Sequence, residues 1–145
     1  MKNSIWKQQF TPELVNSLRK STINEVLGIE LVEIGPDYIT ARMPVDHRTH
    51  QNYGMLHGGA SVVLAETLGS VASTACLEDL QRQMAVGVEI NANHLRSVKS
   101  GFVTGTVRPV KVGRTIHVWS IEISDEYGRL VCVSRLTVAV VNQKG

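Results

Sequence analysis

The segment from Gly58 to Leu80 is the feature that most restricts how this chain of 145 residues can fold. We expect it to form a long helix, and small or apolar residues occupy nearly all sides of that helix: Ala60, Val62, Val63, Leu64, Ala65, Leu68, Val71, Ala72 and Ala75. A helix that is apolar all round is stable only when other elements cover it. The segment therefore predicts a buried helix at the centre of the molecule.

Segments with strand patterns lie on both sides of this helix in the sequence. Thr11 and Pro12 predict the start of a short helix that ends near Lys20, because threonine caps a helix and proline suits its first turn. The expected strands are 28–34, 38–43, 84–92, 102–111, 119–124 and 129–141. On the third of these we expect one face to carry Met84, Val86, Val88, Ile90 and Ala92.

The order of these elements is a helix, two strands, the long helix and four strands. A run of strands interrupted by one central helix predicts an α+β fold, in which an antiparallel sheet wraps around that helix. Residues 1–145 fit one such domain with one core. One helix is too small to cover a broad sheet, and exposed strand edges favour pairing between subunits, so we expect a homo-oligomer.

The composition excludes several classes of function. A net charge of +2 and an aromatic content of 5% are too low for a nucleic-acid-binding surface. Cys76 and Cys132 form neither a metal-ligand spacing nor a disulfide framework, and no zinc, phosphate-loop or dinucleotide motif occurs, so we expect no metal or cofactor. Residues 1–10 lack a signal-peptide pattern and no apolar run is long enough to span a membrane, which predicts a cytoplasmic protein.

The sequence His57-Gly58-Gly59 opens the long helix. The first turn of a helix has free backbone N–H groups at the positive end of the helix dipole. Two glycines leave room for a ligand oxygen to reach these groups, an arrangement that polarises a carbonyl in an oxyanion hole. The alternative is that Gly58 and Gly59 only permit a tight turn or a close contact with the sheet.

Glu66 lies about two turns into the same helix. A buried carboxylate without partners is costly, so such a residue is paired, protonated or functional. Ser70 and Ser73 follow at positions i+4 and i+7 and extend a narrow polar stripe. The alternative is a structural glutamate that pairs with an arginine of the sheet. Because no Gly-x-Ser-x-Gly motif occurs, Glu66 is the best candidate for the catalytic group of a hydrolase.

Other polar residues surround the start of the helix. Gln51 and His57 could bind a substrate carbonyl or orient water, although His57 could instead cap the helix or pack structurally. His94 and Arg96 follow an expected strand and could line the mouth of a pocket, while Arg135 could add a bidentate contact to a phosphate. The alternative for each arginine is a solvent-exposed position.

In these motifs the chain resembles the hotdog-fold acyl-CoA thioesterases of the phenylacetate-degradation and 4-hydroxybenzoyl-CoA type. Within that group it is similar to the bacterial 1,4-dihydroxy-2-naphthoyl-CoA thioesterases of menaquinone synthesis, and to their paralogue that proofreads aryl carrier protein in enterobactin synthesis. The resemblance runs from Trp6 to Val141, and its strongest parts are Met43–Thr49, Gly54–Glu66, Glu89–His94 and Ser134–Thr137.

The resemblance implies hydrolysis of an acyl-CoA, with an aryl-CoA such as 1,4-dihydroxy-2-naphthoyl-CoA as the first candidate substrate. It implies that Glu66 is the nucleophile or general base and that the Gly58 N–H polarises the thioester carbonyl. Gln51 and His57 would position that carbonyl or the leaving thiolate. The family also forms dimers with active sites across the interface, which pair into homotetramers.

The resemblance further implies where the substrate lies. Ser70 would line the acyl pocket, and His94 and Arg96 would contact the pantetheine arm or the nucleotide phosphates. The family often has Gln-Pro-Phe-Gly where this chain has Gln-Asn-Tyr-Gly, so Tyr53 would bring a hydroxyl near the acyl pocket. Two alternative functions stay open: a proofreading thioesterase that acts on mischarged aryl carrier protein, and a non-catalytic acyl-CoA-binding module of the same fold.

Overall fold

The computed structural model describes residues 3–143. Its helices are α1 (Pro12–Ser17), α2 (Ile23–Leu27) and α3 (Gly58–Ala75). Its strands are β1 (Glu30–Ile34), β2 (Ile39–Pro44), β3 (Gln83–His94), β4 (Phe102–Val112), β5 (Ile116–Ser124) and β6 (Leu130–Asn142). The α+β composition expected from the sequence is confirmed.

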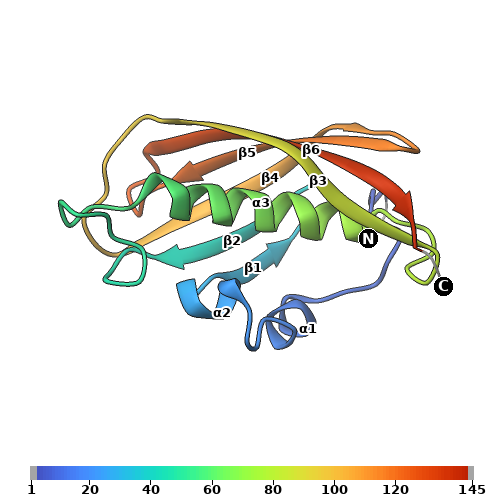
Figure 1. Ribbon diagram of the computed structural model, residues 1–145, viewed down its shortest axis with the longest axis horizontal. Helices are drawn as coiled ribbons and strands as arrows, with labels where there is room; N and C mark the ends of the chain where they lie inside the picture. The colour runs from blue at the N-terminus through green and yellow to red at the C-terminus, as the bar shows by residue number, and fades with distance from the viewer. Residues whose placement is uncertain (1–2, 144–145) are drawn as a thin grey trace.

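The strands form an antiparallel six-stranded sheet in the order β1-β2-β4-β5-β6-β3. α3 lies lengthwise across one face of this curled sheet, and α1 and α2 lie near β1 (Figure 1). The expected arrangement of a sheet wrapped around one long helix is therefore confirmed. No helix among residues 3–143 combines the length and hydropathy needed to cross a bilayer.

α3 buries the face that meets the sheet. Leu64, Ala65, Leu68 and Ala72 have no exposed surface and belong to the same apolar cluster as Trp119 of β5. The apolar residues at 62, 63 and 71 are only half-buried. The prediction of a central helix is thus correct, but its outer side is partly open.

The end of α3 differs from the prediction, because the helix stops at Ala75 and not at Leu80. The backbone N–H groups of Lys7 and Gln8 donate to the carbonyl of Ala75 at 2.8 and 3.1 Å. The side-chain amide of Gln8 also donates to the carbonyl of Leu77 at 2.6 Å. The N-terminal segment thus bonds to the last carbonyls, and the chain turns away instead of continuing the helix.

The N-terminal third also corrects two predictions. α1 ends at Ser17 and not near Lys20, and α2 follows as a short helix that the sequence pattern did not predict. Gly28 ends α2 with a left-handed φ of 72°, a conformation that glycine adopts without strain. The first strand consequently begins at Glu30 instead of at residue 28.

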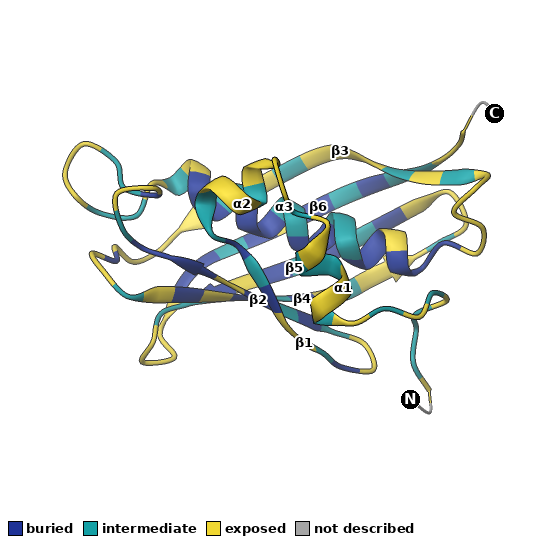
Figure 2. Cartoon of the chain, turned by 90° about the horizontal axis from the view of Figure 1, so that it is seen from below, coloured by how far each residue is buried: buried dark blue, intermediate teal, exposed yellow. Residues whose placement is uncertain are grey.

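β3 forms one edge of the sheet, and none of its residues is fully buried (Figure 2). Gly87 pairs with Val138 and Glu89 pairs with Thr137, so Val88 is an extra residue without a partner in β6. Such an insertion is a β-bulge, which bends a strand and changes which face its later side chains occupy.

The bulge contradicts the expectation that alternate residues of this strand share one face. Before the bulge, Met84 and Val86 are 44% and 40% exposed. After it, Ile90 and Ala92 pack against the apolar cluster beneath α3. The alternating pattern runs through the bulge in the sequence without a break, so periodicity alone placed these residues on one face.

Candidate active site

A cleft of about 390 Å³ opens at the N-terminal end of α3. The loop before α3, the first turn of α3 and the segment around the end of β3 contribute its polar lining: Gln51, Gly58, Ser61, His94, Arg96 and Ser97. The backbone N–H of Leu56 donates to the carbonyl of Val98 at 2.8 Å and joins the two loops. The fold thus brings together four residues that the sequence singled out, Gln51, Gly58, His94 and Arg96.

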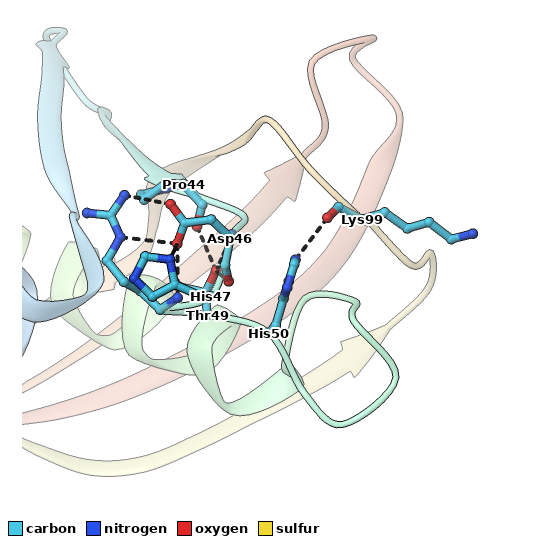
Figure 3. A network of polar contacts seen from close by, with 7 residues as sticks. Pro44, Asp46, His47, Thr49, His50 and Lys99 are labelled. Atoms are coloured by element: carbon cyan, nitrogen blue, oxygen red, sulfur yellow. Dashed lines mark hydrogen bonds and ion pairs between the residues drawn. The ribbon is translucent and has the colours of Figure 1, made fainter.

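A network of polar contacts braces the loop that carries Gln51 (Figure 3). The buried hydroxyl of Thr49 donates to the carbonyl of Pro44 at 2.7 Å, and Nε2 of His50 lies 2.9 Å from the carbonyl of Lys99. The Arg48 side chain donates hydrogen bonds to the Asp46 carboxylate, the shorter of them at 2.7 Å. These hydrogen bonds lower the pKa of Asp46 to about 2. The loop is therefore fixed against the segment after β3.

His57 caps α3, which was the structural alternative for this residue. Its Nδ1 accepts a hydrogen bond from the N–H of Gly59 at 2.8 Å. Because Nδ1 is the acceptor, a neutral His57 carries its proton on Nε2. The exposed ring therefore has an N–H donor available at the entrance of the helix, so capping and substrate binding are compatible.

The backbone N–H of Gly58 makes no hydrogen bond with any residue that the structure describes. It is the first residue of α3, at the positive end of the helix dipole. A Cβ atom on Gly58 would lie 2.7 Å from Nε2 of His94, so the histidine ring occupies the space that a side chain would fill. The cleft thus contains a free N–H donor directly beside an imidazole.

The remaining cleft residues differ in how well the sequence predicted them. His94 and Arg96 are exposed, and Arg96 makes no ion pair within residues 3–143. Ser61, which is 1% exposed, also lines the cleft and was missed. Its position three residues after Gly58 was the available signal, because this spacing puts both residues on one side of a helix.

Tyr53 lies outside the cleft. Its side chain is 85% exposed, and its backbone N–H donates to the side-chain oxygen of Gln51. The Gln51 oxygen is therefore occupied within the loop, whereas its NH₂ group is available to the cleft. A contact between the Tyr53 hydroxyl and an acyl group stays a prediction, because Tyr53 does not line the cleft.

Glu66 is half-buried and makes no hydrogen bond or ion pair with any described residue. The expected alternative, a pairing with an arginine of the sheet, therefore does not occur within residues 3–143. Glu66 follows Gly58 by eight residues, which corresponds to about 12 Å along an α-helix. Its carboxylate lies beside Gly87 of β3 and is not part of the cleft lining.

Ser70 lies one turn beyond Glu66 and lines a different cavity. This apolar groove of about 310 Å³ runs between α1 and α3, and its walls include Phe10, Leu14, Leu18 and Val71. Leu14 and Leu18 are 49% and 70% exposed, so the groove is open on the α1 side. Ser70 supplies one of its few polar groups.

Arg135 is separate from both cavities. It lies in the middle of β6, where it pairs with Asn91 of β3 and Ser120 of β5. The next residue, Leu136, is buried beneath α3, and successive strand residues point to opposite faces, so Arg135 lies on the outer face. Within one chain, Arg135 therefore does not lie in the cleft that contains Arg96.

The cysteines offer no alternative nucleophile. Cys76 and Cys132 are both buried, and burial raises the pKa of both thiols, that of Cys76 to about 11. A thiol with so high a pKa stays protonated at neutral pH and reacts poorly. Within residues 3–143, no group of three or more His, Cys, Asp or Glu side chains has the arrangement of a metal site.

Known proteins of one enzyme family are similar to this chain. A family model described as the thioesterase superfamily matches residues 53–132. A 1,4-dihydroxy-2-naphthoyl-CoA hydrolase of Escherichia coli K12 is 50% identical over 94% of this chain and 99% of that protein. A proofreading thioesterase of Cronobacter turicensis is 49% identical over 94% of this chain and 98% of that protein.

Solved structures extend the likeness to three dimensions. A thioesterase of Haemophilus influenzae has a TM-score of 0.92 and 52% identity, over 95% of both chains. A thioesterase of Pseudomonas aeruginosa, in a variant with a glutamine-to-alanine substitution, has a TM-score of 0.94 and 48% identity, over 97% of this chain and all of that one. The chain therefore belongs to the thioesterase superfamily, and the protein is a thioesterase with the hotdog fold.

Proposed function

We propose that this thioesterase hydrolyses an aryl-CoA to the free acid and coenzyme A, with Glu66 as the group that acts on the thioester. The observation that carries this proposal is the Glu66 carboxylate, which lies half-buried on an apolar helix without a described hydrogen-bond or ion-pair partner. A structural carboxylate in such a place is normally paired. Glu66 either attacks the thioester carbonyl or removes a proton from the attacking water.

Stabilisation of the developing oxyanion falls to Gly58. Its N–H has no acceptor within the described chain, and Gly58 lines the cleft. The dipole of α3 adds a positive potential at the same point. The proton-bearing Nε2 of His57 and the NH₂ group of Gln51 are further donors that can hold the carbonyl or the departing thiolate.

The distance along α3 favours an active site that is built from two copies of the chain. A thioester carbonyl is within hydrogen-bond reach of both an oxyanion donor and a nucleophile only when these groups are a few ångströms apart. Gly58 and Glu66 are separated by about 12 Å of helix. We infer that the Gly58 cleft of one protomer faces the Glu66 of another, so that the protein acts as a dimer or a higher oligomer.

The groove that contains Ser70 is suited to the acyl group. Its walls are apolar, it begins one helical turn from Glu66, and Ser70 offers a hydroxyl to a polar substituent of a ring. An aromatic acyl group fits this chemistry, and the E. coli relative is named for a dihydroxynaphthoyl thioester. We propose 1,4-dihydroxy-2-naphthoyl-CoA as the first substrate to test.

The exposed Arg96 and His94 are suited to the leaving group. The Arg96 guanidinium is a bidentate phosphate donor without a described ion-pair partner, and it lines the same cleft as Gly58. A phosphopantetheine arm is common to coenzyme A and carrier proteins. Since the Cronobacter turicensis relative is named a proofreading thioesterase, an aryl carrier protein is the second candidate substrate.

Thiol release from benzoyl-CoA measures the proposed reaction directly. We expect Glu66→Gln and Glu66→Ala to stay folded and to lose about 10²- to 10⁴-fold in kcat, as is typical when a general base or nucleophile is removed. Glu78→Gln is the matched control, because it neutralises an exposed glutamate beyond the other end of α3. A wild-type rate in a folded Glu66 variant would overturn the proposed role.

A substrate panel tests the acyl group and the carrier separately. Benzoyl, naphthoyl and hexanoyl thioesters, each offered on CoA and on an aryl carrier protein, should show a higher kcat/KM for the aromatic groups on CoA. A strict preference for the aliphatic chain would remove the aryl assignment. A preference for the protein-bound aryl group would instead favour the proofreading function.

A further inference from the structure

We propose that Gly87 is a positioning residue for the Glu66 carboxylate, an inference that rests on the catalytic role proposed for Glu66. Gly87 lies in β3, beside the helix that carries Glu66. A Cβ atom on residue 87 would lie 2.7 Å from Oε2 of Glu66 and 3.7 Å from its Cδ. The carboxylate therefore occupies the space that any side chain at position 87 would take.

The backbone at position 87 does not itself require glycine. The described glycines with a positive φ are Gly28, Gly54, Gly101 and Gly128, and Gly87 is not one of them. A glycine inside a strand weakens the strand, because it restricts the unfolded chain little and packs no side chain. The close approach of Glu66 is thus the reason that the structure offers for a glycine at this position.

The surroundings of Gly87 restrict where the carboxylate can lie. Leu136 of β6 fills the neighbouring space, since its Cδ1 would be 3.8 Å from a Cβ on Gly87, and its Cδ2 occupies the place of a Cβ on Gly69 of α3. The bulge at Val88 follows directly, on the edge of the sheet that has no neighbouring strand. β-Bulges often redirect groups beside active sites. Gly87 thus leaves room for the Glu66 carboxylate on the face of β3 that meets α3, in the strand at the edge of the sheet.

Gly87→Ala separates this role from a general effect on the fold. The atom that the new methyl group meets is the end of a flexible side chain, so Glu66 can swing aside and the protein can still fold. We expect the melting temperature to be unchanged or higher, because alanine restricts the unfolded chain more than glycine does. We expect kcat to fall about 10- to 100-fold, since a displacement of about 1 Å at a reacting group has effects of this size.

The effect should appear in kcat and not in KM, because Gly87 does not line the cleft that holds the proposed CoA contacts. Gly105→Ala is the matched control. Gly105 lies in β4 on the same side of the sheet, and a Cβ there would be 2.7 Å from Cδ1 of Leu68, an equal crowding without a carboxylate. We expect this variant to keep the wild-type kcat even where its melting temperature changes.

A double-mutant cycle with Glu66→Asp identifies the carboxylate as the group through which Gly87 acts. The shorter aspartate leaves room for a methyl group at position 87, so Gly87→Ala should lower kcat less in the Glu66→Asp background than in the wild type. Equal losses in both backgrounds would overturn the positioning role, as would a wild-type kcat for Gly87→Ala while Glu66→Gln is inactive. An active Glu66→Gln would overturn the proposed function itself, so the two failures are distinguishable.

Discussion

At the scale of single residues, a polar chain buried between α3 and the sheet depends on the protonation of His117. Nε1 of Trp119 donates to Oγ of Ser73 at 2.6 Å, and Nδ1 of His117 lies 2.9 Å from the same oxygen. His117 is 2% exposed and Ser73 is fully buried. Burial disfavours the charged imidazolium, so His117 is neutral, and its Nδ1 and the Ser73 hydroxyl share one hydrogen bond whose donor is set by the histidine tautomer.

Acid should therefore destabilise the protein through His117. Burial lowers the pKa of His117 below its ordinary value of 6.5, and a hydrogen bond to the Gly113 carbonyl offsets part of this. The unfolded chain then binds more protons as the pH falls through 6.5. The His117 contribution to the free energy of unfolding should therefore be constant well above that pH and decrease as the pH falls below it. Urea unfolding at a series of pH values from about 5 to about 8, on both sides of the ordinary histidine pKa of about 6.5, measures this free energy.

Two variants assign this pH dependence. His117→Asn removes the titrating group and should flatten the slope between pH 5.5 and 6.5, around the ordinary pKa of about 6.5. His47→Gln should retain the slope, because the His47 side chain is 89% exposed. A slope that persists in His117→Asn would assign the effect to other groups.

Candidate catalytic residues could be predicted from the sequence where the evidence for them lies within one short segment. Glu66 and Gly58 stand out because a helix start and an apolar helix are local features. The gathering of Gln51 with Arg96 was not predictable from spacing, since it requires the end of β3 to meet the loop before α3. Gly87 was missed for the same reason, because its neighbour Glu66 is distant in the sequence.

At the scale of elements, the C-terminal end of α3 depends on Gln8. The Gln8 amide donates to the carbonyls of Leu77 and Glu78 at 2.6 and 3.4 Å. We expect Gln8→Ala to lower the free energy of unfolding by about 1 kcal/mol, the usual contribution of such a hydrogen bond. For a chain of this length that corresponds to a melting temperature lower by about 2–4 °C. Calorimetry measures the shift.

The control for Gln8 is Gln81→Ala, which shortens an exposed glutamine whose side chain makes no hydrogen bond with a described residue. Its melting temperature should stay at the wild-type value. Both variants should keep the wild-type kcat, because neither side chain lines the cleft or the groove that contains Ser70. An unchanged melting temperature for Gln8→Ala would show that water replaces the amide without loss.

The elements were predictable to the extent that their pattern is local. Alternation located the strands, and the glycine pair located the start of α3. The end of α3 was not predictable, because bonds from Lys7 and Gln8 determine it. The five residues of α2 are too few to give a periodic pattern, and the bulge at Val88 leaves the alternation in the sequence intact.

At the scale of the whole molecule, the free edge of β3 is the surface at which we expect a second copy of the chain to bind. β3 has a neighbouring strand on one side only, and its apolar residues Met84, Val86 and Val88 are 44%, 40% and 62% exposed. An unprotected apolar edge favours pairing with another strand. Glu66 lies beside Gly87 of β3, and His94 of the Gly58 cleft ends the same strand, so a site shared between two copies would need their β3 edges to meet.

Complementation between two inactive variants tests this shared site. Gly58→Pro removes the N–H donor, and proline is well suited to the first position of a helix that follows an extended residue such as His57, whose ψ is 130°. A mixed dimer of Gly58→Pro with Glu66→Gln contains one site with both native groups. Random pairing of equal amounts should therefore restore about a quarter of the wild-type sites.

The two candidate arrangements give opposite results in this experiment. If Gly58 and Glu66 of the same chain formed one site, every site in the mixed dimer would lack one group and no activity would return. Gly58→Ala serves as the control for crowding, because its methyl group meets His94 as proline does but leaves the N–H in place. A loss in Gly58→Pro that exceeds the loss in Gly58→Ala by about 100- to 1000-fold identifies the N–H as the oxyanion donor. Recovery on mixing then shows that two copies of the chain supply one active site.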